Sequence, residues 1–319
     1  MSGSPEQKPI EPAEFREQPA ETRDVVNNVP SEARDAAPAE SVAPDPAFPL
    51  NESAELQVPS HHLDLPADLR VPWTARDVIL FALFYLLSPF IVALPLFIAA
   101  AASRHGDMNA VMNDKQFQAT LSIVAQAAAA LLTLGYLWVL VKVKNAGQFW
   151  HAIGWTSLAA TAAARRRIAL TIVGGGICLS VAVTMASSFI GQKKPLPIEE
   201  LVQTRQAMIL LMTFGVLVAP LVEETVFRGV LYPIIARRIG IAGSVIVTGM
   251  LFGAVHALQL WGGWGQIALI VIVGILLTWV RAIRRTVWAS YLLHLSYNST
   301  LFLGALYATG GFRHMENMK

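Results

Sequence analysis

The segment APLVEETVFRGVLYP carries three charges, Glu223, Glu224 and Arg228, within an otherwise apolar run. An acidic or basic residue at the centre of a membrane-spanning helix costs about 2.5–3.5 kcal/mol on insertion scales, so three of them within six positions indicate a function. Glu224 and Arg228 are four residues apart and share one helix face, with the glutamate on the N-terminal side that favours an ion pair. Glu223 is turned about 100° away and cannot share that partner equally. A buried ion pair that only fixes helix packing explains Glu224 and Arg228 as well as a catalytic role does.

Two further apolar segments carry the other strongly polar side chains of the last four predicted helices. LFGAVHAL contains His256, and YLLHLSYNS contains His294 and Asn298, which are four residues apart and point the same way from one helix. A carboxylate, two imidazoles and an amide that converge in a bundle core can polarise a water molecule and stabilise an oxyanion. A hydrogen bond between helices explains each histidine singly, so the hypothesis depends on the combination.

Other kinds of hydrolytic site lack their residues in this chain. The last aspartate is Asp114, before the second predicted spanning helix, so the later helices cannot hold an aspartate pair. The sequence contains no HExxH helix and no GxSxG turn. The single cysteine, Cys178, has no histidine near it in the sequence and excludes a disulfide within the chain. Water activated by glutamate and histidine is the remaining route for a hydrolase.

Long apolar runs must position these residues. Of the 319 residues, 54% are hydrophobic and 14% charged, whereas soluble domains carry about 25% charged residues. A spanning helix needs about 20 apolar residues, and seven segments qualify: 78–102, 119–141, 168–190, 207–233, 241–259, 265–281 and 287–308. The predicted fold class is therefore an all-α polytopic membrane protein, a bundle of about seven to eight transmembrane helices. Residues 145–164 are the candidate eighth, interfacial helix, because tryptophans precede arginines there. Gly174–Gly176 and Gly274 are small enough to let helices approach closely.

Charge and proline divide the chain into two parts. Residues 1–77 hold 15 acidic and 6 basic residues, and residues 78–319 hold 7 and 18. An acidic, proline-rich segment without apolar periodicity cannot bury enough surface to fold, so we expect residues 1–72 to be a disordered leader, and no signal peptide is recognisable in it. Most loop lysines and arginines follow the second, fourth and sixth predicted spanning helices. The protein is therefore expected to be an integral, multi-pass protein of the cytoplasmic membrane with its N-terminus in the cytoplasm.

The predicted spans leave one geometric difficulty. Counted from the predicted cytoplasmic ends at about 1.5 Å per residue, His294 lies nearer that face than His256. A tilt, or a helix break at Pro220 or Pro233, must bring the two histidines level. Proline is tolerated in spanning helices where neighbours satisfy the backbone.

In this order the motifs resemble those of the CPBP family of intramembrane proteases, which includes CAAX prenyl endopeptidases and the bacteriocin-processing or immunity proteins also called Abi proteins. The family pattern E-E-x-x-x-R, F-x-x-x-H and H-x-x-x-N stands here as residues 223–228, 252–256 and 294–298. Each motif is weak alone, but all three in order within apolar helices are a specific signal. The chain then divides into the leader (1–72), two first spanning helices (73–144), a CPBP-like protease core (145–308) and a tail (309–319).

The resemblance implies hydrolysis of peptide bonds within or at the edge of the membrane, with CAAX-type C-terminal processing as one form. Glu223 would be the general base and would activate water together with His256. His294 and Asn298 would stabilise the tetrahedral oxyanion. The resemblance also gives supporting roles to Glu224, Arg228, Phe227 and Phe252.

A zinc cofactor is left open by the same resemblance. The family has been described as metalloproteases, and Glu223, His256 and His294 would make an open three-ligand zinc site. A metal-free glutamate mechanism uses the same residues. We favour water held by Glu223 and His256, with zinc as the alternative.

Two other functions compete with the protease. A non-catalytic immunity or scaffold protein would keep the fold without the chemistry. A transporter would use intramembrane charges as an ion or proton path, but it predicts a hydropathy repeat between halves, and none is seen. The partners expected for the protease are the lipid bilayer and a peptide or protein substrate with a membrane-proximal segment, and no nucleic acid.

Overall fold

The computed structural model describes residues 66–190, 196–201 and 204–314, and every regular element within these ranges is a helix. The described residues all belong to one compact unit, residues 58–319. The predicted disordered leader therefore lies outside the described residues as far as residue 65. The prediction of an all-α polytopic fold is confirmed.

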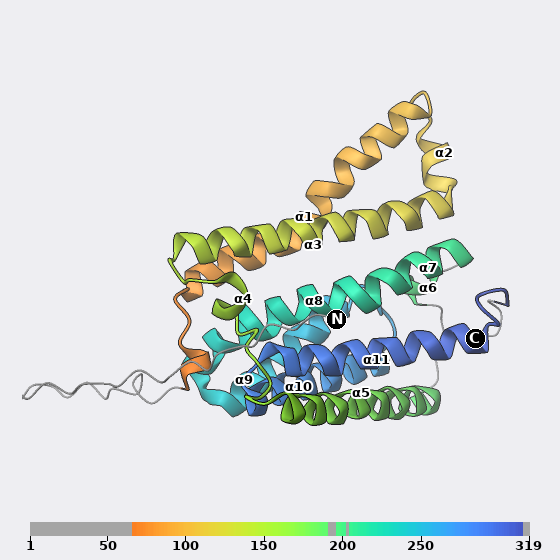
Figure 1. Ribbon diagram of the computed structural model, residues 1–319. Helices are drawn as coiled ribbons and strands as arrows, with labels where there is room; N and C mark the ends of the chain where they lie inside the picture. Colours follow the sequence, from red (N-terminus) through yellow and green to blue (C-terminus); the bar gives the residue numbers. More distant parts are fainter. Residues whose placement is uncertain (1–65, 191–195, 202–203, 315–319) are drawn as a thin grey trace, which may run out of the picture. The chain divides into compact units, whose positions relative to one another are not determined.

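A long hairpin opens the described chain. After the short 3₁₀ helix η1 (Ala67–Leu69), helix α1 (Ala75–Ser103) begins at a capping box in which Thr74 and Asp77 satisfy each other's backbone amides. Helix α2 (Met108–Asn113) links it to α3 (Lys115–Val143), which packs against α1. The second half of α1, which contains two internal prolines, bends away from α3 (Figure 1).

The predicted interfacial helix over 145–164 is reduced to one turn. Within this segment α4 (Phe149–Ala152) is the one separate helix, and α5 (Ala162–Ile190) begins inside its last residues, six residues before the predicted start at 168. Arg165, Arg166 and Arg167 therefore lie in the first turns of α5 rather than in a loop. Arginine is a good helix former, so the helix extends beyond the apolar run that predicted it.

The next helical run turns back on itself at Gly240, where the backbone adopts φ 77°. The chain is helical from Arg205 to Ile239, and a second leg returns from Ile241 to His256. Glycine adopts such a positive φ without the steric penalty of a side chain. The elements preceding and within the run are α6 (Pro197–Leu201), α7 (Arg205–Thr213), the π-helix η2 (Phe214–Val218), α8 (Ala219–Glu224), the π-helix η3 (Thr225–Leu231) and α9 (Tyr232–His256).

Helices α10 (Trp264–Arg284) and α11 (Val287–Ala308) complete the bundle, with α10 packed on α9 and α11 on α5 (Figure 1). Close approach depends on two of the predicted glycines. A Cβ on Gly274 would lie 2.9 Å from the Gly249 carbonyl oxygen, and one on Gly176 would lie 2.6 Å from the Leu293 carbonyl oxygen. A Cβ on Gly174, in contrast, would meet nothing within 4 Å.

The described part of the chain contains five helical stretches long and apolar enough to cross a membrane, one of which is the 52-residue run that Gly240 divides. Helix α11 has the length but is not among them; it carries His294, Asn298 and several hydroxyl side chains. Large apolar side chains face outward, such as Phe90 at 70% and Phe189 at 86% exposure. Such a surface is compatible with lipid rather than with water, so the protein is an integral membrane protein.

Candidate active site

The two glutamates lie on a short α-helical piece between two π-helices. Helix α8 carries Glu223 and Glu224 near its end, with η2 before it and η3 after it. Pro220 begins the piece after η2, and Pro233 stands just after η3. Proline lacks an N–H and clashes with the carbonyl four residues earlier, and a π-helical widening relieves both problems without ending the helix. The chain therefore continues through both prolines and breaks at Gly240 instead, which corrects the break expected at the prolines.

The hairpin at Gly240 brings Glu223 and His256 together. Glu223 lies 17 residues before Gly240 and His256 lies 16 residues after it, so the two antiparallel legs place them at the same depth. Glu223 Oε1 is 3.8 Å from His256 Nε2, and Glu223 Oε2 is 3.7 Å from His294 Nε2. His256 and His294 therefore lie at the same depth in the bundle, because both rings face the Glu223 carboxylate, and the difference in depth counted from the sequence does not arise.

The second nitrogen of each histidine is held by a hydrogen bond. His256 Nδ1 lies 2.8 Å from the Phe252 carbonyl oxygen, and His294 Nδ1 lies 2.9 Å from Glu224 Oε1. Both partners are acceptors, so Nδ1 must carry the proton in each ring. In a neutral ring, Nε2 then presents its lone pair toward Glu223.

A buried ion pair supports this arrangement from behind. Arg228 Nη1 donates to Glu224 Oε1 at 2.9 Å, and both side chains are fully buried. Arg228 also donates through Nε to Thr278 Oγ1 and through Nη2 to the Gly274 carbonyl oxygen. Glu224 Oε1 thus links Arg228 to His294, and Arg228 links α10 to the π-helix that follows Glu224.

Two phenylalanines surround the polar groups. The Phe252 ring lies 4.7 Å from the His256 ring and 5.7 Å from the His294 ring, and the Arg228 guanidinium stands 4.5 Å from its centre. Phe227 packs edge-on against Phe252 at 5.3 Å. Apolar walls of this kind strengthen the electrostatic interactions inside them.

Asn298 is oriented toward the backbone of η2. Its Nδ2 donates to the Gly215 carbonyl oxygen at 2.8 Å. In the i to i+5 pattern of a π-helix that carbonyl would pair with residue 220, which is proline and has no N–H. The Asn298 amide therefore satisfies, with one of its two N–H groups, an acceptor that Pro220 leaves open.

Several contributors to the site were not predicted. Thr278 and Gly274 bind Arg228, but a threonine and a glycine in an apolar helix give no signal of that role. Two indoles donate to η3, Trp73 Nε1 to the Val230 carbonyl oxygen and Trp155 Nε1 to Thr225 Oγ1. Trp155 lies in the segment predicted to be an interfacial helix, and no role was predicted for Trp73; both side chains are buried.

No group of three or more His, Cys, Asp or Glu residues within the described ranges is arranged to hold a metal ion. The donor types of Glu223, His256 and His294 are those that zinc takes in open catalytic sites. No step proposed below goes through a metal.

The described helices and this cluster define a class of protein: an all-α integral membrane protein with a glutamate and two histidines gathered inside its bundle. Residues 205–300 match the family model described as type II CAAX prenyl endopeptidase Rce1-like. This match confirms the resemblance to the CPBP family and covers the helices that carry all three motifs. The match is narrower than the predicted core, since residues 145–204 and 301–308 lie outside it. A search of curated proteins found no match, and a search of solved structures found none either.

Proposed function

We propose that the protein is an intramembrane endopeptidase in which Glu223 activates a water molecule for attack on a peptide bond. The observation that carries the proposal is the position of the Glu223 carboxylate between the Nε2 atoms of His256 and His294. Distances of 3.7–3.8 Å exceed a direct hydrogen bond, and a polar separation above about 3.5 Å is one that a water molecule can bridge.

The protonation pattern supports a water molecule there. Because both Nδ1 atoms donate elsewhere, two Nε2 lone pairs face the carboxylate oxygens. These groups are all hydrogen-bond acceptors and need a donor between them, and a water molecule supplies two O–H donors. His256 and Glu223 are each about one-fifth exposed, so the cluster is open on the side where they stand.

The proposed reaction transfers protons within this cluster. Glu223 takes a proton from the water while the oxygen attacks the peptide carbonyl carbon, and the resulting oxyanion is stabilised by an N–H donor. His294 can be that donor when its Nε2 takes up a further proton from the open side of the site, since Glu224 accepts from its Nδ1; Glu223 and His256 are then the two acceptors that hold the water. Glu223 then gives its proton to the leaving amine as the C–N bond breaks. Asn298 gives one of its two amide N–H groups to Gly215, and its second N–H is the proposed further oxyanion donor.

The test is cleavage of an internally quenched, membrane-anchored peptide by the full-length protein in lipid nanodiscs. Glu223→Gln keeps the size of the side chain and removes the base, so the rate should fall by about 100-fold or more. His256→Ala should also lower it strongly. The matched control is Glu199→Gln on α6, which should cleave like the wild type.

Cleavage by Glu223→Gln at the wild-type rate would contradict the proposal and favour the non-catalytic scaffold. A strong chelator should leave the wild-type cleavage rate unchanged. A fall in that rate that added zinc restores would overturn the proposal that the mechanism is metal-free.

The name of the matched family points to a prenylated C-terminal peptide as the substrate class. A farnesylated peptide should therefore be cleaved at least ten times more efficiently than its unmodified counterpart, and equal efficiencies would reject this substrate class alone.

A further inference from the structure

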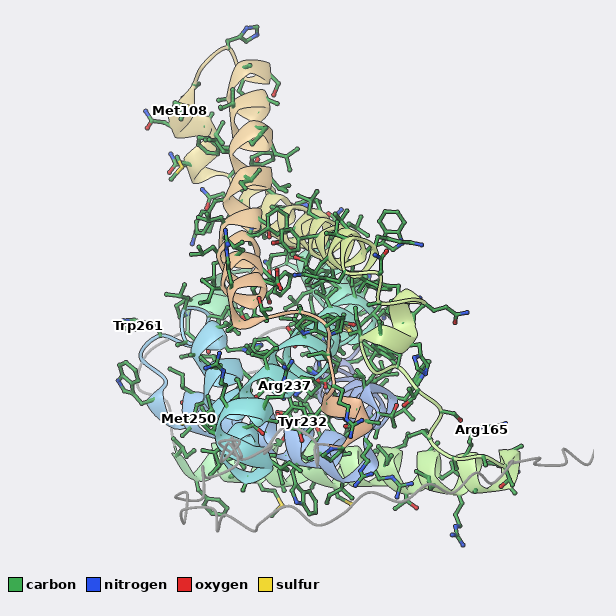
Figure 2. All side chains as sticks on the ribbon, turned by 90° about the vertical axis from the view of Figure 1, so that its left-hand side faces the viewer. Met108, Arg165, Tyr232, Arg237, Met250 and Trp261 are labelled. Carbon is green, nitrogen blue, oxygen red and sulfur yellow. The ribbon has the colours of Figure 1, made fainter. Side chains whose placement is uncertain are left out.

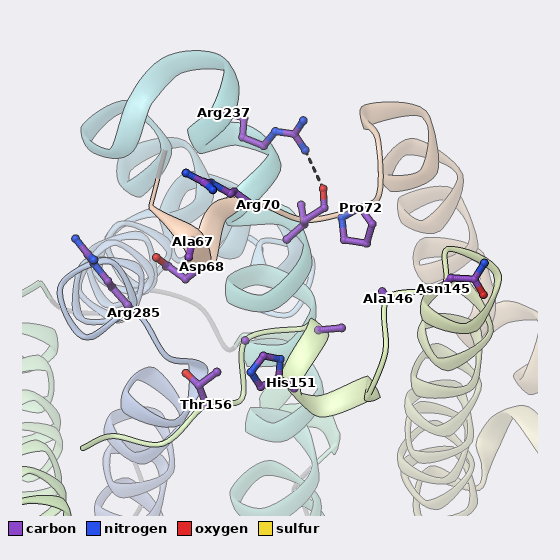
Figure 3. Close-up of a pocket in the computed structure, with 13 residues that line it drawn as sticks. Ala67, Asp68, Arg70, Pro72, Asn145, Ala146, His151, Thr156, Arg237 and Arg285 are labelled. Atoms are coloured by element: carbon purple, nitrogen blue, oxygen red, sulfur yellow. Dashed lines mark hydrogen bonds between the residues drawn. The ribbon is translucent and has the colours of Figure 1, made fainter. Parts of the chain in front are cut away.

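A pocket of about 730 Å³ opens at the end of the bundle where η1, the α3–α4 connection, α9 and the end of α10 come together (Figure 3). Three arginines from different elements line it: Arg70, Arg237 and Arg285. His151 of α4 lines it as well. None of these residues takes part in the Glu223 cluster, and all but Arg237 and Arg285 lie outside the part of the chain that matches the family.

The lining of this arginine pocket has an excess of positive charge. Among the described residues that line it, Asp68 is the one acidic residue, and it is already paired with the fully buried Arg281 at 2.7 Å. Arg237 donates through Nη1 to the Val71 carbonyl oxygen, which holds its side chain against the rim (Figure 3). The carboxylate of Asp68 is therefore neutralised by Arg281, while Arg237 and Arg285 contribute positive charge to the lining.

Arg285 stands at a position that would suit another residue better. It caps α10 in the left-handed conformation at φ 55°, where glycine or asparagine is usual. Its side chain nevertheless lines the pocket. The chain thus has a positively charged side chain at a backbone position where glycine or asparagine is usual.

The pocket lies where long apolar helices end. Helix α3 has 29 residues and is about 43 Å long at 1.5 Å per residue, which spans a bilayer of about 40–45 Å with its headgroups. Asn145 and Ala146, just beyond its end, belong to the lining. A ligand in this pocket would therefore be at the level of the lipid headgroups.

We propose that the arginine pocket binds a phosphate group, and that its source is the headgroup of an anionic phospholipid. Guanidinium groups match phosphate oxygens in charge and geometry, and basic pockets between spanning helices bind such headgroups. The volume lies in the range of about 300–1,000 Å³ that is typical of small-molecule sites, which favours a headgroup over a bare phosphate ion.

The test measures binding of a short-chain phosphatidylglycerol to the full-length protein in neutral detergent micelles by calorimetry. The double variant Arg237→Gln/Arg285→Asn removes two positive charges. The glutamine keeps an amide donor for the Val71 carbonyl, and the asparagine suits the left-handed backbone at position 285. This variant should bind the lipid at least ten times more weakly than the wild type. The matched control, Arg166→Gln/Arg167→Gln, removes the same charge from exposed positions on α5 and should stay within twofold of the wild type. In the view of Figure 2, Arg165, their neighbour in the sequence, lies at the right-hand edge, whereas Arg237 lies near the centre.

Equal weakening of both double variants would overturn the proposal, because general surface charge would then explain the binding. Inorganic phosphate that binds as tightly as the lipid would overturn the lipid source. If the double variant melts at a lower temperature than the wild type, Arg237→Gln alone replaces it, with an expected loss of at least threefold; an unchanged affinity rejects the site. The readout is lipid binding, so these outcomes are independent of peptide cleavage.

Discussion

Arg228 supplies the counter-charge with which Glu224 remains buried. It pairs with Glu224 through Nη1, and its Nε and Nη2 donate to Thr278 and the Gly274 carbonyl. A buried pair of this kind contributes little against an apolar replacement, but removing one partner leaves an uncompensated charge. Glu224 in addition holds His294, so the pair has a stabilising role and a positioning role that can be separated.

Substituting one or both members of this pair separates the two roles. Arg228→Met should lower the free energy of unfolding by about 3–5 kcal/mol, because Glu224 stays buried without its counter-charge. Glu224→Gln/Arg228→Met should recover most of that loss, since no charge then remains. The measurement is reversible unfolding in mixed micelles, combined with the peptide-cleavage rate.

The double variant is expected to fold but to cleave slowly, because His294 loses the carboxylate that fixes its proton. If the double variant were less stable than Arg228→Met, the two side chains would not be compensating each other. Full cleavage activity in the double variant would show that His294 does not need Glu224.

At the scale of elements, the π-helix η3 is held from two sides by indole N–H groups. Trp73, from the segment before α1, and Trp155, from the segment before α5, reach Val230 and Thr225 respectively. Thr225 directly follows Glu224. Segments outside the matched family region therefore fix the helix that follows the two glutamates.

Replacing either tryptophan by phenylalanine removes the donor but keeps an aromatic ring. Trp155→Phe and Trp73→Phe should each cost about 1 kcal/mol of stability, the net value of one hydrogen bond. Because a small displacement of a catalytic group is costly, kcat should fall about tenfold while KM changes little. The measurement is the kinetics of peptide cleavage together with thermal unfolding.

Trp288→Phe is the matched control. Trp288 packs edge-on against Trp155 at 5.0 Å, but its indole makes no hydrogen bond among the described residues. It should therefore retain kcat. An equal loss of kcat in Trp288→Phe and Trp155→Phe would assign the effect to aromatic packing rather than to the hydrogen bond on Thr225.

At the scale of the whole described unit, basic and aromatic side chains mark different connections. Arginines and the residues after α3 surround one pocket. The connection between α9 and α10 carries the exposed Trp261 and no lysine or arginine, and the exposed Trp264 begins α10. Loops rich in arginine and lysine remain in the cytoplasm, and tryptophan is enriched at membrane interfaces. We propose that the end with the arginine pocket faces the cytoplasm.

Cysteine labelling tests this orientation in intact cells. In a Cys178→Ser background, Gln148→Cys lies in the α3–α4 connection and Trp261→Cys in the α9–α10 connection. A membrane-impermeant maleimide should label Trp261→Cys directly and Gln148→Cys only after the membrane is opened. The reverse pattern would invert the topology.

Much of the fold could be predicted because the bilayer imposes length and apolarity on each spanning helix. The apolar run at 265–281 lies within α10, and the run at 287–308 coincides with α11. Helix starts were less predictable, since Arg165–Arg167 are polar yet helical in α5. Glycines also differed in ways that spacing does not reveal: Gly274 lies against Gly249, while Gly174 faces open space.

The sequence by itself determined which residues are chemically exceptional, because a charge inside an apolar helix is costly wherever the helix is placed. It therefore identified Glu223, Glu224, Arg228, His256, His294 and Asn298. Only the tertiary structure decided what each of them contacts. The turn at Gly240 brings His256 to Glu223, and the proline in α8 leaves the carbonyl that Asn298 satisfies. These contacts join residues far apart in the chain, and their geometry depends on how helices pack, which no local spacing encodes.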